Sequence, residues 1–228
     1  CNAAYAGSIP STDGWTLTPV VEGSTITFLL GIDNMSELLA YDGIVTKSWG
    51  DPTLSDPTKF LSFGDDGGTL RSLTIEVDAD PQVSLSFDYV AGPSGNKVVV
   101  TPNIVSFPAL TNPMGRATAA ITVTDRNGDG AFVSGMHDGR MYQTYYAMEN
   151  VPTVAYFTSL IDGPITVPAY LSDTRHESCD WQVLTGDVKW ICSEFAFNLS
   201  PEDSASGTSV FIVQPVPEPG SMVALLSG

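Results

Sequence analysis

Apolar and polar residues alternate with a period of two along much of this chain. From Leu73 to Val77 every second residue is apolar, and the residues between them are polar. The same alternation recurs at 85–89, 121–124 and 195–199. Successive side chains of a strand point to opposite faces of a sheet, so the pattern predicts strands with one buried and one wet face. We predict further strands at 24–30, 97–101, 141–147, 153–158, 165–170 and 209–213.

Turn-forming Gly, Pro, Asp and Asn separate these segments, and no stretch carries a long helical stripe. About ten short strands with such punctuation favour an all-β fold, a two-sheet β-sandwich of jelly-roll-like type. A chain of 228 residues suits one such domain, and a hydrophobic content of 43% can fill its core. We therefore expect a single sandwich over residues 7–213.

The charge balance narrows the partners of this domain. Nine Lys and Arg oppose 26 Asp and Glu, which gives a formal net charge of −17. Such a field repels nucleic-acid phosphates and anionic lipid headgroups, so we expect neither as a partner. It attracts divalent cations, although the acidic residues are dispersed as on an ordinary solvated surface.

The three cysteines include no C-x-x-C pair and the two histidines are isolated, so neither a zinc nor an iron–sulfur site is indicated. If residues 185–186 form a hairpin turn, Trp181 faces Trp190 and Cys179 faces Cys192. Counting outward from that turn puts the cysteine pair at a non-hydrogen-bonded position of the hairpin. At such a position the opposing Cα atoms lie about 4.5 Å apart, within disulfide range. We therefore predict a Cys179–Cys192 disulfide, which would contribute about 3 kcal/mol and indicates an oxidising compartment.

Asp125, Asn127 and Asp129 match the opening D-x-[DN]-x-[DN]-G of a calcium loop. The twelfth position of that loop is Met136, where a calcium loop has a bidentate Glu. Calcium is thus a candidate cofactor, and the fold requires none.

The same segment also contains a turn signal. Asn127-Gly128 is typical of a type I′ hairpin, and that turn would pair Val123 with Phe132. The turn interpretation is favoured over the metal, but both can hold together because oxygen-rich turns of β-sandwiches bind calcium.

No catalytic motif is present, so the sequence does not predict an enzyme. His137 and His176 lie in polar segments without a G-x-S-x-G elbow, and there is no phosphate-binding or dinucleotide-binding glycine loop. The tryptophans are either core residues or a sugar-stacking platform. They are Trp15, Trp49, Trp181 and Trp190.

Residues 1–6 end in Ala4-Tyr5-Ala6, the A-x-A pattern after which signal peptidase cleaves. We interpret them as a signal-peptide remnant, with Gly7 as the mature N-terminus. Two alternatives stay open: Cys1 as the lipid-bearing residue of a lipoprotein, and a plain flexible terminus.

Residues 214–221 are rich in proline and run into the apolar segment 222–226. Val216, Pro217, Glu218 and Pro219 form a Val-Pro-Glu-Pro box. In this the chain resembles the PEP-CTERM proteins of Gram-negative and related bacteria, in which that box precedes a hydrophobic helix and an arginine cluster. The resemblance implies recognition by an exosortase-type sorting enzyme during export. Residues 214–228 are then a truncated sorting tail, because the rest of the helix and the arginines are missing.

Together these observations predict an exported structural or adhesive protein of the cell surface or extracellular (biofilm) matrix. It would self-associate through exposed strand edges. The alternative is a carbohydrate-binding module for exopolysaccharide, and a secreted hydrolase comes third.

Overall fold

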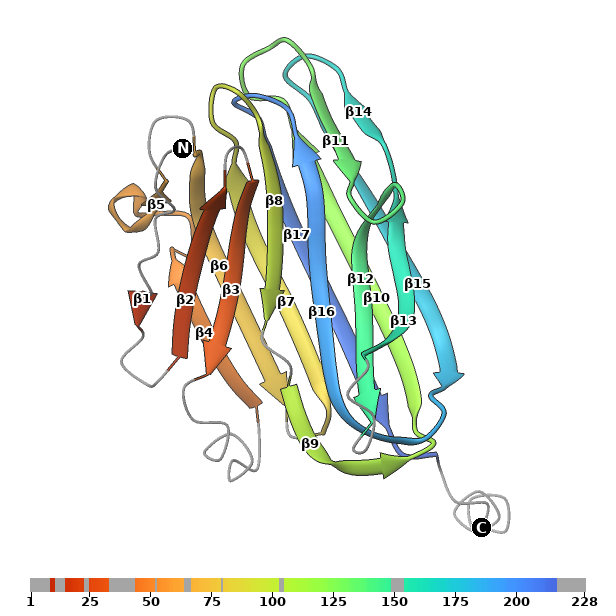
Figure 1. Ribbon diagram of the computed structural model, residues 1–228. Coiled ribbons are helices and arrows are strands. Elements are labelled where there is room, and N and C mark those ends of the chain that lie inside the picture. Colours follow the sequence, from red (N-terminus) through yellow and green to blue (C-terminus); the bar gives the residue numbers. More distant parts are fainter. Residues whose placement is uncertain are drawn as a thin grey trace, which may run out of the picture.

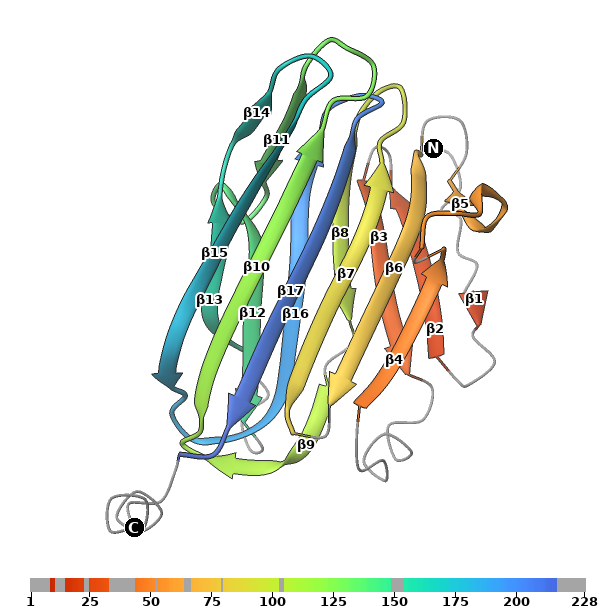
Figure 2. The ribbon, with the colours of Figure 1, turned by 180° about the vertical axis from the view of Figure 1, so that it is seen from behind.

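The chain folds into two β-sheets that pack face to face (Figures 1 and 2). The computed structural model describes residues 9–10, 15–22, 25–32, 44–51, 53–63, 67–78, 80–102, 105–148 and 154–216. These ranges contain seventeen strands and one short 3₁₀ turn, η1 (Pro57–Lys59). The predicted all-β, two-sheet sandwich is therefore confirmed. No helix in these ranges is long and apolar enough to cross a membrane.

The larger sheet has ten strands and the smaller has seven. The larger contains β1 (Ile9–Pro10), β2 (Trp15–Glu22), β3 (Thr25–Ile32), β8 (Asn96–Pro102), β9 (Val105–Thr111), β11 (Ala131–Gly135), β12 (Arg140–Met148), β13 (Ala155–Asp162), β14 (Ile165–Val167) and β16 (Asp187–Leu199). The smaller contains β4 (Ile44–Gly50), β5 (Leu61–Ser62), β6 (Thr69–Asp78), β7 (Gln82–Val90), β10 (Met114–Thr124), β15 (Ser172–Val183) and β17 (Ser204–Gln214). Described strand pairs are antiparallel, apart from the parallel pair β3–β8.

The alternation read from the sequence matches the burial of the strands. In β7, Val83, Leu85, Phe87 and Tyr89 are buried, and the residues between them are more exposed. Strands β6, β10 and β17 alternate in the same way. One face of each strand therefore enters the core between the sheets, as the two-residue period requires.

Aromatic rings connect the two sheets at the centre of the core. The Phe87 ring of the smaller sheet lies 5.1 Å from the Phe195 ring and 5.6 Å from the Phe197 ring of β16 in the larger sheet. Gly207 is paired with Phe87, and a Cβ at that glycine would lie 2.3 Å from the Phe87 ring. Glycine in β17 thus makes room for the ring, whose burial contributes about 1.5–3 kcal/mol.

The predicted 185–186 hairpin is wrong. Strand β15 pairs with β10 in the smaller sheet, whereas β16 lies in the larger sheet between β11 and β12 on one side and β8 and β9 on the other. With both sides of β16 occupied, β15 has no edge of it to join. Residues 184–186 therefore cross from one sheet to the other.

The Cys179–Cys192 disulfide prediction is wrong for the same reason. Cys179 is paired with Ala117 of β10, and Cys192 with Tyr145 of β12. Cys179 packs against the core, while the Cys192 Sγ lies 3.7 Å from the Thr101 hydroxyl and both thiols are free.

The Asn127-Gly128 hairpin is also wrong. Strand β10 has β15 on one side and β17 on the other, so β11 cannot pair with it. Phe132 is instead paired with Thr166 of β14 in the larger sheet. The segment from Asp125 to Gly130 is thus a loop that crosses between sheets at one end of the sandwich (Figure 1).

Glu177 of the edge strand β15 ties the smaller sheet to the end of β13. Its carboxylate accepts hydrogen bonds from the backbone N–H groups of Ile161 and Asp162, both at 2.9 Å, and from the Arg140 guanidinium at 3.1 Å. Ile161 has a φ of +64°, a left-handed conformation that is costly for a β-branched residue. The carboxylate stabilises this strained turn across the open side of the sandwich.

We expect Glu177→Gln to lower the free energy of unfolding by about 1–3 kcal/mol, because an amide satisfies the two N–H groups and the guanidinium poorly. Urea denaturation followed by tryptophan fluorescence measures the change. Glu76→Gln on the outer face of β6 is the control and should cost less than about 0.5 kcal/mol. Equal stabilities of the two variants would contradict the role of Glu177.

Cys179 and Cys192 should react as free thiols. In a Cys1→Ser background, denatured and unreduced protein should yield two thiols with Ellman's reagent, because Cys179 and Cys192 are free. In the native protein Cys192 should react more slowly, since burial raises its pKa to about 11. If the thiols react only after the protein has been reduced, Cys179 and Cys192 form a disulfide and this prediction is wrong.

Candidate functional site

Three loops meet at one end of the sandwich, at the top of Figure 1, and the Asp125 carboxylate joins two of them. Its Oδ1 accepts a hydrogen bond from the Gly130 N–H at 2.9 Å, and its Oδ2 accepts one from the Gly128 N–H at 3.0 Å. The Tyr170 N–H, from the β14–β15 loop, also donates to Oδ2 at 2.5 Å. This bond from Tyr170 is the main reason that the pKa of Asp125 is lowered. Asp125 is therefore a buried, ionised acceptor that holds the loops together.

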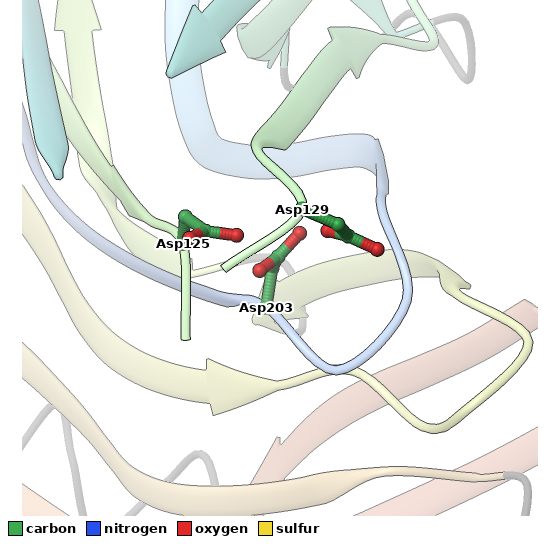
Figure 3. A group of neighbouring side chains, drawn as sticks. All are labelled: Asp125, Asp129 and Asp203. Atoms are coloured by element: carbon green, nitrogen blue, oxygen red, sulfur yellow. The ribbon is translucent and has the colours of Figure 1, made fainter. Parts of the chain in front are cut away.

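The third loop adds Asp203, which precedes β17 and is fully buried. Oxygen atoms of Asp125, Asp129 and Asp203 lie within 4.8 Å of one another (Figure 3). Asp203 accepts hydrogen bonds from the Arg126 N–H at 3.1 Å and from the Ser200 hydroxyl. Burial raises the pKa of Asp203, and the nearby carboxylates of Asp125 and Asp129 add to that effect. We call Asp125, Asp129 and Asp203 the acidic cluster.

The sequence found two of these three residues. The Asn127 side chain bonds elsewhere: its Oδ1 accepts from the Asp129 N–H at 3.2 Å, and its Nδ2 donates to the Pro201 carbonyl at 3.4 Å. The loop ends at Gly130 because β11 begins at the next residue, so Met136 is no part of it. Asp203 carries no local motif, and only the crossing of the chain between the sheets places it here.

The acidic cluster offers the ligand type that hard divalent cations prefer. Calcium takes six to eight oxygen ligands in flexible geometries. A carboxylate oxygen has two lone pairs, so an oxygen that accepts one N–H still has a lone pair for a cation. Asp129 is exposed and reaches solvent, while Asp125 and Asp203 are buried. The donor set therefore fits a calcium ion whose other ligands are water.

A cleft of about 650 Å³ opens beside the acidic cluster. Its lining residues come from the β5–β6, β7–β8, β10–β11 and β16–β17 loops and the adjoining strand ends, and five of them have polar side chains. The lining residues are Ser62, Gly68, Thr69, Val90, Ala91, Gly92, Pro93, Arg126, Asn127 and Glu202. Arg126 and Asn127 belong to the same loop as Asp125 and Asp129, and Glu202 adjoins Asp203. The cleft and the acidic cluster thus share two loops.

Two buried side chains position the walls of the cleft. The Tyr89 hydroxyl lies 2.5 Å from the Gly67 carbonyl and 2.8 Å from the Asn96 Oδ1, and that Oδ1 accepts a hydrogen bond from the Gly92 N–H at 2.7 Å. Gly68 has a φ of +73°, and a Cβ there would lie 2.4 Å from the Tyr89 hydroxyl. The backbone on both sides of the cleft is thereby attached to one buried pair.

The alternative of a sugar-stacking platform finds no support in the described residues. Trp49 is buried in the core, while Trp181 and Trp190 are half-buried on strands of different sheets; Trp15 lies in β2, with its side chain outside the described part. On the larger sheet the rings of Tyr145 and Tyr156 meet edge to face at 6.4 Å, which is not a coplanar surface.

The remaining candidates from the sequence lie apart from the cleft. The His137 Nε2 is 3.0 Å from a Glu194 oxygen, and His176 is exposed on β15. Within the described residues, neither histidine is hydrogen-bonded to a serine or cysteine side chain. Of the sorting box only Val216 is described, and it is exposed; Pro217, Glu218 and Pro219 lie outside the described residues, as do residues 1–6 with Cys1.

No family model matches the chain, and no curated protein matches its sequence. Among solved structures, a CBM22-1 xylan-binding domain of Paenibacillus barcinonensis Xyn10C is 6% identical, with a TM-score of 0.27 over 78% of this chain and 99% of that chain. The K1 cleaved adhesin domain of Lys-gingipain from Porphyromonas gingivalis W83 is 11% identical, with a TM-score of 0.26 over 94% and 97%. A protein of infectious bursal disease virus, Gx strain, is 8% identical, with a TM-score of 0.29 over 78% and 56%. These scores define no family.

We expect Asp125→Asn to lower the melting temperature at neutral pH, because the amide nitrogen meets backbone N–H groups where the carboxylate accepts from them. The pKa of Asp125 is lowered in the folded state, so its contribution to stability is present above about pH 4 and is lost as the pH falls further. Differential scanning calorimetry from neutral to acid pH should therefore show the two melting curves converging.

The matched control for this experiment is Asp129→Asn in the same loop. Asp129 is exposed and accepts none of the three N–H bonds, so its substitution should leave the melting temperature nearly unchanged. A loss equal to that of Asp125→Asn would show that charge alone, and not the three bonds, accounts for the effect.

Proposed function

We propose that the chain is an exported structural or adhesive domain of a bacterial cell surface or extracellular matrix, which makes its contacts through the loop end of the sandwich. The convergence of the acidic cluster and the polar cleft at that end carries the proposal. Loops on a rigid β-scaffold commonly hold the binding residues of a protein. The net charge of −17 and the all-β fold fit an extracellular role, and the Val216–Pro219 box supports export by an exosortase-type enzyme.

We propose that a calcium ion binds to the acidic cluster at this loop end. Three carboxylates at close range repel one another, and a divalent cation between them removes that repulsion. Extracellular calcium modules bind with dissociation constants of about 10⁻⁴–10⁻³ M, which suits a site of three carboxylates and water. The ion would hold the Asp125–Gly130 loop against the β16–β17 loop and so stiffen one wall of the cleft.

Self-association through the edge strand β15 is less well supported than binding through the loop end. Arg175 and Glu177 of the edge strand β15 turn toward the sandwich and bond to the end of β13. Inward-pointing charges are a device by which β-proteins prevent edge-to-edge pairing. Adhesion through the loops is therefore favoured over polymerisation through β15.

We expect calcium at about 10 mM to raise the melting temperature by about 3–10 °C over the protein in chelator, because the folded state alone assembles the site. Asp129→Asn removes one ligand and should abolish most of this shift, although its melting temperature in chelator stays near that of the parent. Magnesium at the same concentration is the ionic control. A shift that is equal for both ions, or unaffected by the substitution, would remove the calcium site.

The cellular location of the protein can be tested in the bacterium that produces it. Antibodies against the chain should label intact, unpermeabilised cells or their extracellular matrix, and a strain that lacks the protein should attach less to surfaces. Labelling that requires permeabilisation would contradict export. Labelled cells whose attachment does not depend on the protein would contradict the adhesive role alone.

A further inference from the structure

We infer that the cleft beside the acidic cluster is a binding site for a neutral saccharide, held by hydrogen bonds rather than by aromatic stacking. The inference rests on the proposed function and names its ligand class. The cleft has a volume of about 650 Å³, within the range of about 300–1,000 Å³ in which small-molecule sites fall. A site of this size takes a short stretch of a chain molecule, such as a few sugar residues.

The polar side chains of the lining match the hydrogen-bonding pattern of vicinal hydroxyls. A sugar hydroxyl donates one hydrogen bond and accepts others. Arg126 supplies only donors and Glu202 only acceptors. Asn127 supplies the one Nδ2 proton and the one Oδ1 lone pair that its bonds to Pro201 and Asp129 leave unused. Ser62 and Thr69 add hydroxyls on the opposite wall, and Val90 and Pro93 offer apolar surface to the C–H faces of a ring.

Charge decides between saccharide classes. The lining contains one positive group, Arg126, and one negative group, Glu202, so its formal charge is balanced. Beyond it lies the acidic cluster, whose three carboxylates keep a net negative charge even with one calcium ion bound, within a chain of net charge −17. This field repels uronate or sulfated sugars, whereas Arg126 counters a cationic ligand. A neutral saccharide meets neither repulsion.

The backbone that lines the cleft includes a residue in a strained conformation. Glu202 has a φ of +59°, a left-handed conformation that few residues other than glycine, Asn and Asp adopt, and its N–H donates to the Gly92 carbonyl at 3.1 Å. A strained non-glycine residue in a loop that lines a cleft points to a function for its side chain. Glycine would fit this conformation without strain, but it would remove the carboxylate from the cleft.

Because of this strain, a glycine substitution at position 202 can remove a binding group without lowering the stability of the protein. Glu202→Gly should keep or raise the melting temperature, while it removes an acceptor from the cleft. Arg126→Ala removes the donor from an exposed position and should also fold. Two controls are not among the residues that line the cleft: Glu76→Gln on the outer face of β6 and the exposed Lys97→Ala on β8.

Binding is measured with the full chain in calcium by ¹H–¹⁵N NMR and isothermal titration calorimetry. The probes are neutral gluco-, manno-, xylo- and galacto-oligosaccharides, with oligo-uronates for comparison. We expect at least one neutral series to saturate, with shifted amides at Gly68, Thr69, Gly92 and Glu202. Both cleft variants should weaken that binding about tenfold or more, and the controls should not.

Three results would overturn the inference: no binding in the whole panel, preference for the uronates, or neutral binding that the cleft variants leave unchanged. They leave the proposed function standing if intact cells are still labelled and still attach through the protein. Conversely, saturable neutral binding by a protein confined to the cell interior would support the cleft and refute the surface role.

Discussion

The packing of Phe87 against Phe195 and Phe197 is the contact on which the loop end depends. It holds the inner faces of the two sheets together, with Gly207 making room for the ring. Because the two sheets are fixed face to face, the separation that each inter-sheet loop must span is also fixed. The segment from Asp125 to Gly130 is one such connection, and residues 200–203 are another. Their meeting at one end of the sandwich therefore follows from the core and not from the loops themselves.

Carboxylates act as structural acceptors where the chain leaves regular pairing. Asp51, which is buried, accepts hydrogen bonds from the backbone N–H groups of Thr53, Ser55 and Asp56 in the turn after β4. Asp125 does the same for the loops of the candidate site, and Glu177 does so for the end of β13. In each case a buried or half-buried carboxylate satisfies donors that no strand can satisfy. Several acids of this very acidic chain thus have an internal role besides keeping the surface charged.

The acidic cluster combines two opposite electrostatic settings within a few ångströms. Backbone donors, the Tyr170 N–H foremost, stabilise the charged form of Asp125, whereas burial favours the neutral form of Asp203. Two neighbouring acids with pKa values driven apart share their charge unevenly, which reduces their mutual repulsion. A cation between them would make full ionisation of both favourable, because its positive charge stabilises the charged form of each carboxyl group.

Local sequence patterns predict the class of fold and two of the three residues of the acidic cluster. The two-residue period at Leu73–Val77 and in the other strands is a property of neighbouring residues, so it survives without any tertiary knowledge, and Asp125 and Asp129 lie in one short motif. Both predicted hairpins failed because a turn signal cannot show whether the next strand still has a free edge to join. Strands β10 and β16 had none, so the chain crossed to the other sheet. That crossing separated Cys179 from Cys192 and brought Asp203 and Glu202 to the loop of Asp125, a contact between distant segments that only the packing of the two sheets could decide.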